Sequence, residues 1–255
     1  RAEEIASGAA KMKRSGNPLE PEPLGGRAAL LSVEIKAAYD SEFLYMRAEW
    51  DSKGAAWHTK KSAAVQPDRV SIQMNKGERS FTRYGCFISC HNDLNTMPAS
   101  PSKKDVASNP YYGAIGRDDV RLYAFYARDS WDRKKSGAEL DKKLKEGGRI
   151  ELISAELAGG ESSAKSGWVF DDRIWDDTPD VEASGVWNNG RYAVIFKKRL
   201  RPKDPKDISL RQGAVVSVGI AVHDDGASKR RHYVSFPFTI GLDADADVRA
   251  AKVSQ

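Results

Sequence analysis

The strongest local signal in this sequence is a hairpin turn between two hydrophobic segments. The tripeptide Asn188-Asn189-Gly190 separates Val186-Trp187 from a segment rich in aromatic and aliphatic residues at 191–196. An Asn-Gly pair supplies the positive φ values that a tight β-hairpin turn requires. The pattern therefore predicts two antiparallel strands joined directly by a short turn.

Alternation of apolar and polar residues repeats this β signal along the chain. Leu31, Val33 and Ile35 alternate with polar residues, as in a strand with one buried face. Further strands are predicted at residues 43–50, 69–74, 150–155, 168–175, 214–222 and 233–240. Many short strands between Gly, Pro and Asn turns favour a mainly β fold, an antiparallel β-sandwich with long loops and a few short helices. The helices are predicted at 1–13 and 138–145.

The length of 255 residues allows a single large β domain. We expect a β-sandwich domain at residues 28–243, an N-terminal arm or linker at 1–27 and a C-terminal tail at 244–255. Long loops are predicted at 53–67 and 91–116. Loops of this length in a compact domain are usually functional or disordered.

Charge and hydropathy exclude several functional classes. The formal net charge is only +5 and the basic residues form no recognisable face, so we do not expect nucleic-acid binding. No apolar run approaches the roughly 18–20 residues of a membrane span. The sequence also contains no phosphate-binding loop and no nucleophile motif of the kind that would indicate an enzyme. The chain begins at Arg1 rather than Met and shows no signal-peptide core, so we expect that an upstream segment has been cleaved or left out.

Both cysteines and one of the four histidines lie within six residues, in the order Cys86, Cys90, His91. Cys-x-x-Cys-His is the motif of covalent haem attachment, in which two thiols bind the porphyrin and the histidine coordinates iron. Here three residues separate the cysteines, and a turn can absorb the additional residue. The motif therefore indicates a c-type haem.

Three other interpretations of the cysteines stay open. Cys86 and Cys90 could form a disulfide in an exported protein. They could bind zinc, although a structural zinc site needs four ligands and the chain has no second cysteine pair. They could also be buried thiols. A histidine directly after the second cysteine has no role in a plain disulfide, which favours haem.

The residues around the cysteines resemble a known family. Tyr84-Gly85-Cys86, Cys90-His91-Asn92-Asp93-Leu94 and Met97-Pro98 are similar to the attachment segment of c-type members of the haem-binding family of ethylbenzene dehydrogenase γ-subunits and related periplasmic cytochromes. The similarity continues in the same order through residues 37–40, 43–50, 68–74, 232–237 and 240–242, so that it covers roughly residues 28–243.

This resemblance implies an exported, periplasmic β-sandwich, which a membrane anchor could precede, that holds one covalent haem c and transfers single electrons rather than making bonds. Implied partners are redox proteins: a membrane quinol-oxidising cytochrome, a molybdenum enzyme or a soluble cytochrome. In the family's non-covalent members a methionine and a lysine hold the iron, and His232 stands where that lysine aligns. The resemblance thus implies His91 as the proximal iron ligand and His232 as the distal one.

Four other residues are candidates for the second axial position: Met74, Met97, His58 and His223. A methionine ligand would raise the reduction potential relative to two imidazoles. Met97 follows His91 too closely to reach the opposite face of a porphyrin, and Met74 is on a predicted strand. His58 is expected at the surface and His223 in a turn.

Residues of two kinds could surround a haem. Basic side chains that could pair with its propionates are Arg83, Lys103, Lys104 and Arg117. Aromatic side chains that could pack on the ring are Tyr84, Tyr111, Tyr112 and Trp57.

A carbohydrate-binding β-sandwich is the alternative function. The predicted hairpin at residues 39–50 also resembles the opening of sugar-binding modules, and six tryptophans could supply stacking platforms. In that case Cys86 and Cys90 would form a disulfide and the protein would be colourless.

Overall fold

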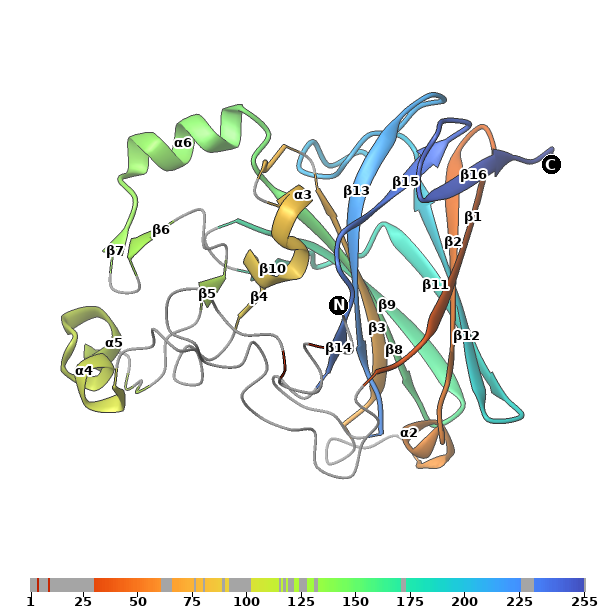
Figure 1. Ribbon diagram of the computed structural model, residues 1–255, viewed down its shortest axis with the longest axis horizontal. Coiled ribbons are helices and arrows are strands. Elements are labelled where there is room, and N and C mark those ends of the chain that lie inside the picture. Colours follow the sequence, from red (N-terminus) through yellow and green to blue (C-terminus); the bar gives the residue numbers. More distant parts are fainter. Residues whose placement is uncertain are drawn as a thin grey trace.

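Figure 1 presents the computed structural model of the chain. It describes residues 30–60, 66–75, 77–79, 81–88, 90–91, 102–114, 116, 118, 122–123, 128–130, 133–170, 173–225 and 232–254, together with Glu4 and Ala9. Within these ranges, residues 84, 87–88, 90–91, 111, 122–123, 128–130 and 134 are described by their backbone alone.

The described residues form mainly β-strands. The long strands are β1 (Val33–Tyr39), β2 (Phe43–Asp51), β3 (Asp68–Asn75), β8 (Ile150–Ala158), β9 (Glu161–Val169), β11 (Val181–Asn188), β12 (Arg191–Arg199), β13 (Val215–His223), β15 (Phe238–Leu242) and β16 (Val248–Lys252). The short strands are β4 (Cys90–His91), β5 (Leu122–Tyr123), β6 (Arg128–Ser130), β7 (Arg133–Lys134), β10 (Arg173–Trp175) and β14 (Tyr233–Val234). The helices are α2 (Ala55–His58), α3 (Phe81–Tyr84), α4 (Lys103–Ser108), α5 (Pro110–Ala114) and α6 (Gly137–Lys145), with a 3-10 helix η1 (Gly85–Ile88).

Hydrogen bonds join the main strands in one continuous order, β10-β9-β8-β3-β13-β15-β16-β1-β2-β12-β11, with β14 added to β13. This path folds into two layers, one from β10 to β15 and the other from β16 to β11 (Figure 1). The predicted mainly β sandwich is thus confirmed. It is mixed rather than fully antiparallel, because β16 runs parallel to both of its neighbours, β1 and β15.

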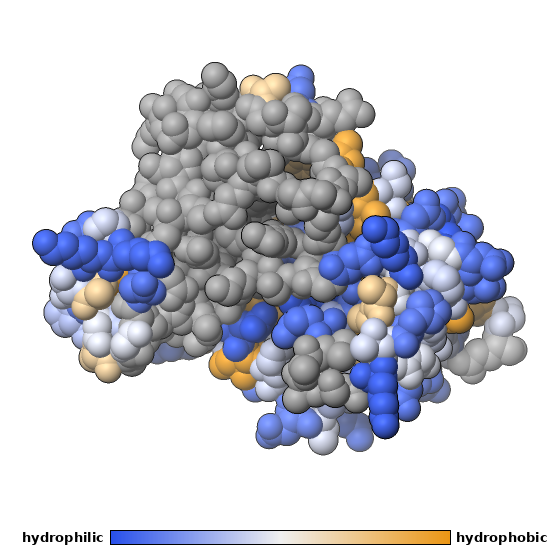
Figure 2. All heavy atoms as spheres, turned by 90° about the horizontal axis from the view of Figure 1, so that it is seen from below, coloured by the Kyte–Doolittle hydropathy of each residue, from blue (hydrophilic) through white to orange (hydrophobic). Residues whose placement is uncertain are grey.

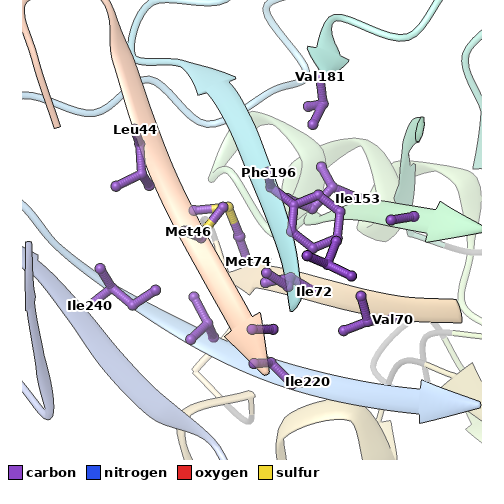
Figure 3. Packing of buried hydrophobic residues seen from close by; sticks show 14 of the residues in the cluster. Leu44, Met46, Val70, Ile72, Met74, Ile153, Val181, Phe196, Ile220 and Ile240 are labelled. Atoms are coloured by element: carbon purple, nitrogen blue, oxygen red, sulfur yellow. The ribbon is translucent and has the colours of Figure 1, made fainter. Parts of the chain in front are cut away.

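The hydrophobic core lies between the two layers. Alternate residues of β2 are buried, among them Met46 and Trp50. Met46 lies beside Met74 of β3, so the two layers meet there (Figure 3). Trp50 packs on Tyr192 of β12 with 5.0 Å between ring centroids. The alternation seen in the sequence therefore directs one face of each strand into this core.

The predicted hairpin is confirmed as β11 and β12. Asn188 pairs with Arg191, and the two turn residues between them, Asn189 and Gly190, have φ values of 47° and 80°. The strand predicted at 168–175 is instead divided, because β9 ends at Val169 and β10 begins only at Arg173, antiparallel to it.

Strand β16 lies within the segment that the sequence predicts as a C-terminal tail. It pairs with β15 on one side and β1 on the other. The Asp247 carboxylate, one residue before β16, accepts hydrogen bonds from the backbone N–H and the hydroxyl of Thr239, both at 2.8 Å. The sheet therefore continues to Lys252, beyond the expected domain boundary at residue 243.

The helix predicted at 138–145 is confirmed as α6. Ser136 and Glu139 form a reciprocal capping box at its start. The predicted long loops contain short helices, α2 in 53–67 and both α4 and α5 in 91–116. The helix predicted at 1–13 lies outside the described residues, apart from Glu4 and Ala9.

The surface of the described residues is mainly hydrophilic when seen from below, with hydrophobic residues in small patches (Figure 2). Among the helices of the described part, none combines the length and the apolar character that a membrane crossing requires.

A cluster of charged residues is buried inside the sandwich. The Lys198 ammonium lies 2.8 Å from Glu151 Oε1, and both residues are 1% exposed. The carbonyl of Ile208 accepts from Lys198 and its N–H donates to Glu151. Beside this pair Asp207 is 3% exposed. Burial raises the pKa of Asp207 to about 8, and its hydrogen bond with Asp180 and the charge of Glu151 add to the rise.

We expect Asp207→Asn to change how stability depends on pH. An unfolded aspartate ionises near a pKa of about 4, whereas folded Asp207 keeps its proton up to a pH of about 8. Between these values the folded state holds the extra proton, so this residue makes wild-type stability fall as pH rises, by about 1.4 kcal/mol per pH unit. Asparagine resembles the protonated acid and does not titrate. The free energy of unfolding of the variant, measured with urea, should therefore rise relative to that of wild type as the pH increases. A difference between the two proteins that does not change with pH would contradict the raised pKa of Asp207.

Candidate functional site

The cysteine segment begins with α3 and η1, which lie against β13. Phe81, the first residue of α3, is fully buried. The chain passes from α3 into η1 at Gly85, whose φ of 56° is a left-handed conformation that glycine adopts without steric cost. A Cβ at Gly85 would lie 3.2 Å from Cδ of Pro237. The junction of α3 and η1 is thus packed on the segment between β14 and β15.

Cys86 is the second residue of η1 and is 5% exposed. Its sulphur lies over Gly219 in the middle of β13, so closely that a Cβ added to Gly219 would be 2.8 Å from Sγ. The ring of Phe81 reaches the same place, with Cζ 3.7 Å from that Cβ position. The absence of a side chain at residue 219 is therefore what allows η1 to lie directly on the strand.

Cys90 and His91 form the short strand β4, whose backbone is described. It pairs with β5, so that Cys90 lies opposite Tyr123 and His91 opposite Leu122. Two of the three residues between the cysteines belong to η1, and η1 contacts both β4 and β13. This segment accordingly keeps the backbone of the second cysteine and of His91 close to the first cysteine.

His232 immediately precedes β14, which pairs with the end of β13. Val222 lies opposite Tyr233 in this ladder. Ser235 extends the contact, since its N–H donates to the carbonyl of Ile220 at 2.8 Å and its hydroxyl oxygen accepts from the N–H of Ile220 at 2.9 Å. The segment from His232 to Ser235 is therefore held along β13.

The imidazole of His232 stacks on that of His223, the last residue of β13. The ring centroids are 4.3 Å apart and the planes differ by 9°. Because Val222 pairs with Tyr233, the next position of the ladder brings the two histidines opposite each other on the same face.

The thiol and the two imidazoles share one face of β13. Alternate residues of this strand belong to the core: Val216, Val218, Ile220 and Val222. Gly219 and His223 therefore point to the outer face, where Cys86 and His232 lie. Four residues along a strand span about 13 Å. The fold thus brings Cys86 and His232, which are far apart in the sequence, to the same outer face of β13.

A buried carboxyl group anchors the end of β13. Asp224, which follows His223, is 5% exposed and accepts a hydrogen bond from the hydroxyl of Ser52 at 2.6 Å. Burial raises the pKa of Asp224 to about 6, and the charges of Asp225 and Asp68 act in the same direction. The contact ties the strand end to the loop between β2 and α2.

The structure keeps two of the alternative ligands, Met74 and His58, away from the outer face of β13, whereas His223 lies on that face beside His232. Met74 lies in the core beside Met46 (Figure 3), on the face of β3 opposite the cysteine. His58 is exposed at the end of α2 and makes an edge-on contact with Trp187 of β11, with 4.5 Å between centroids. Met97 lies outside the described residues.

The basic residues expected around a haem have mixed surroundings. Arg83 and Lys104 are exposed on α3 and α4. Lys103 forms an exposed ion pair with Asp118 at 3.3 Å. Arg117 lies outside the described residues.

Of the aromatic candidates, Tyr112 is buried in α5. Trp57 packs edge-on against Tyr192, 6.0 Å between centroids, at the border of the core. Tyr84 and Tyr111 are described by their backbone alone.

Comparison with known proteins identifies the family. A family model described as ethylbenzene dehydrogenase matches residues 11–235. The chain belongs to the ethylbenzene dehydrogenase family. It is 27% identical over 252 residues to cytochrome c-552 of Stutzerimonas stutzeri, an alignment that covers 98% of this chain and 75% of that protein. The family resemblance predicted from the sequence is thus confirmed, and the chain also has a relative that is named as a cytochrome.

Two solved structures with low similarity are family 9 carbohydrate-binding modules from Caldicellulosiruptor kristjanssonii. The complex with glucose has a TM-score of 0.34 at 12% identity, over 83% of this chain and 69% of that one. The complex with cellotriose has a TM-score of 0.35 at 10% identity, over 83% and 67%.

Sequence reasoning missed the role of Gly219 beside Cys86, and it named His223 as a candidate ligand without foreseeing that this residue stacks on His232. Gly219 interrupts an apolar strand, and a strand glycine often marks a close backbone approach, so a signal was present. The stacking of His223 on His232 has a weaker signal: both residues flank the turn-rich segment 224–231, which favours a hairpin that places them opposite each other.

Proposed function

We propose that this chain is a monohaem c-type cytochrome domain that transfers single electrons and is not itself an enzyme. Cys86 and Cys90 would bind the haem covalently, with His91 as the proximal ligand and His232 as the distal one. The observation that carries the proposal is the placement of the Cys86 thiol and the His232 imidazole on the same outer face of β13, over positions four residues apart.

The donor set at this face fits a c-type haem. The Cys86 thiol comes from η1 and the His232 imidazole from the residue before β14, and both of these segments lie against β13. Gly219 leaves space for the thiol, and a Cβ at that position would close it. A bound haem would supply reversible one-electron chemistry at its iron.

The chain's own residues would bind, orient and shield that group. The packing of Cys86 on Gly219 fixes one attachment point against a rigid strand. The ladder of β14 fixes the backbone of His232. Burial and axial ligation are the means by which a protein tunes haem potential, and both depend here on β13.

The proposal includes a location and partners. A cytochrome of this kind would work in the periplasm, where it would exchange electrons with a membrane quinol-oxidising cytochrome, a molybdenum enzyme or a soluble cytochrome. Family membership and the cytochrome relative support this assignment.

The test is expression of the protein together with a haem-attachment system. The intact chain should carry the added mass of one haem, and its pyridine haemochrome spectrum should be that of thioether-linked haem. Cys86→Ala and Cys90→Ala should each retain a single thioether. Colourless protein with no added haem mass and a Cys86–Cys90 disulfide would overturn the proposal and favour the alternative, a carbohydrate-binding domain.

The ferric absorption spectrum tests the two proposed axial ligands, His91 and His232. Low-spin ferric absorption should be lost in His91→Ala and in His232→Ala. It should be kept in His58→Ala, because His58 lies against Trp187 and away from β13. Retention of the low-spin spectrum in His232→Ala would refute the distal ligand while leaving the covalent haem in place.

A further inference from the structure

We propose that His223 is a positioning residue that fixes the imidazole plane of His232 at the iron. The inference rests on the proposed function, since it takes His232 as the distal ligand. His223 is not among the four residues that the proposed function assigns to haem binding, and the inference gives it a role.

The geometry of the ring pair carries the inference. The planes of His223 and His232 differ by only 9° and the centroids are 4.3 Å apart, so one ring covers the face of the other. The terminal χ2 torsion of histidine is broad, and an imidazole held by its backbone alone can turn about it. A parallel neighbour in face contact resists that rotation, because turning either ring opens the contact.

The two histidines differ in how firmly their strands are held. His223 lies opposite Arg69 of β3, within the main sheet, and the next residue, Asp224, is buried and bonded to Ser52. His232 precedes the two-residue strand β14, which within the described residues pairs with β13 alone. The better-anchored imidazole can therefore orient the other.

Orientation matters for an axial imidazole because the ligand can rotate about its bond to iron. The direction of the imidazole plane sets the splitting of the ferric low-spin electron paramagnetic resonance signal. How tightly the protein fixes the imidazole sets how often this ligand would dissociate from the iron. Groups that orient a metal ligand without touching the metal are known to affect binding strongly. In this chain the orienting contact is a ring stack.

The experiment compares His223→Phe, which keeps a flat ring, with His223→Leu, which has similar bulk and no ring to stack. Both are made as holoprotein next to wild type and His232→Ala. The readouts are the g values and linewidths of the ferric resonance, the reduction potential, and the rate at which carbon monoxide binds the ferrous form. Haem content and far-ultraviolet circular dichroism check that each variant is folded and loaded.

We expect the ferric resonance of His223→Phe to keep the g values and the narrow lines of wild type. In His223→Leu the g values should spread, and carbon monoxide should bind about two- to tenfold faster, as loss of one aromatic contact implies. Wild-type g values and kinetics in His223→Leu, together with loss of the low-spin signal in His232→Ala, would overturn the positioning role and leave the proposed function intact. Loss of the low-spin signal in His223→Leu but not in His232→Ala would make His223 the ligand, which also overturns it.

Discussion

Replacing Lys198 by methionine should lower the free energy of unfolding by about 3–5 kcal/mol, because removing one partner of a buried ion pair leaves the other uncompensated. Lys198 and Glu151 are 2.8 Å apart and almost completely buried. Burial raises the pKa of Glu151, and the Lys198 ammonium is the main opposing influence. Without Lys198, this carboxyl group must either take up a proton or remain charged in the core. Urea unfolding at neutral pH measures the loss.

Two further variants separate the buried pair from a general effect of lost charge. Lys197→Met removes the neighbouring lysine, which forms an exposed ion pair with Glu182 at 3.1 Å, and should cost at most about 1 kcal/mol. The double variant Lys198→Met with Glu151→Gln should recover part of the loss, since no charge then stays buried alone. Equal losses in Lys198→Met and Lys197→Met would contradict the role of burial.

Much of the fold follows from local patterns in the sequence. The turn at Asn189-Gly190 and the alternation along β2 and β12 are visible because each depends on residues close in the chain. They define strands and which side of each strand is buried. Local patterns do not define which strands become neighbours.

The elements that were missed depend on distant partners. Strand β9 is mainly polar in its first half and is held by nine consecutive pairs with β8. Strand β16 has only a short alternation and exists because β15 and β1 enclose it. Its parallel pairing with β1 joins residues more than 200 positions apart in the sequence, which no local period can reveal.

The candidate site divides in the same way. The spacing of Cys86, Cys90 and His91 is local, so the sequence alone indicates the chemistry. The placement of Cys86 and His232 on one face of β13 is set by the register of β13 with β14 and by the packing of η1. Met74 points into the core because it pairs with Val218 of β13, which is itself a core residue. Only the register of the sheet establishes this pairing.

The Gly219→Ala variant tests whether η1 lies on β13 as the structure has it. The new Cβ would lie 2.8 Å from the Cys86 sulphur, so the sulphur or the strand must move. Overpacking of this kind costs about 1–3 kcal/mol. We expect thermal unfolding to show that loss, and the absorption spectrum of the bound haem to change because one of its thioethers is displaced.

A Cys86→Ala background supplies the matched control. Without the sulphur, the nearest remaining atoms to a Cβ at Gly219 are the Cys86 backbone nitrogen and Phe81 Cζ, both at 3.7 Å, which is ordinary van der Waals contact. Gly219→Ala should therefore cost almost nothing further in that background, and the two substitutions should be strongly non-additive, as expected for residues in direct contact. Additive losses would place the cysteine away from β13. That result would also remove the shared face on which the haem assignment depends, because the contacts with this strand place Cys86 and His232 on that face.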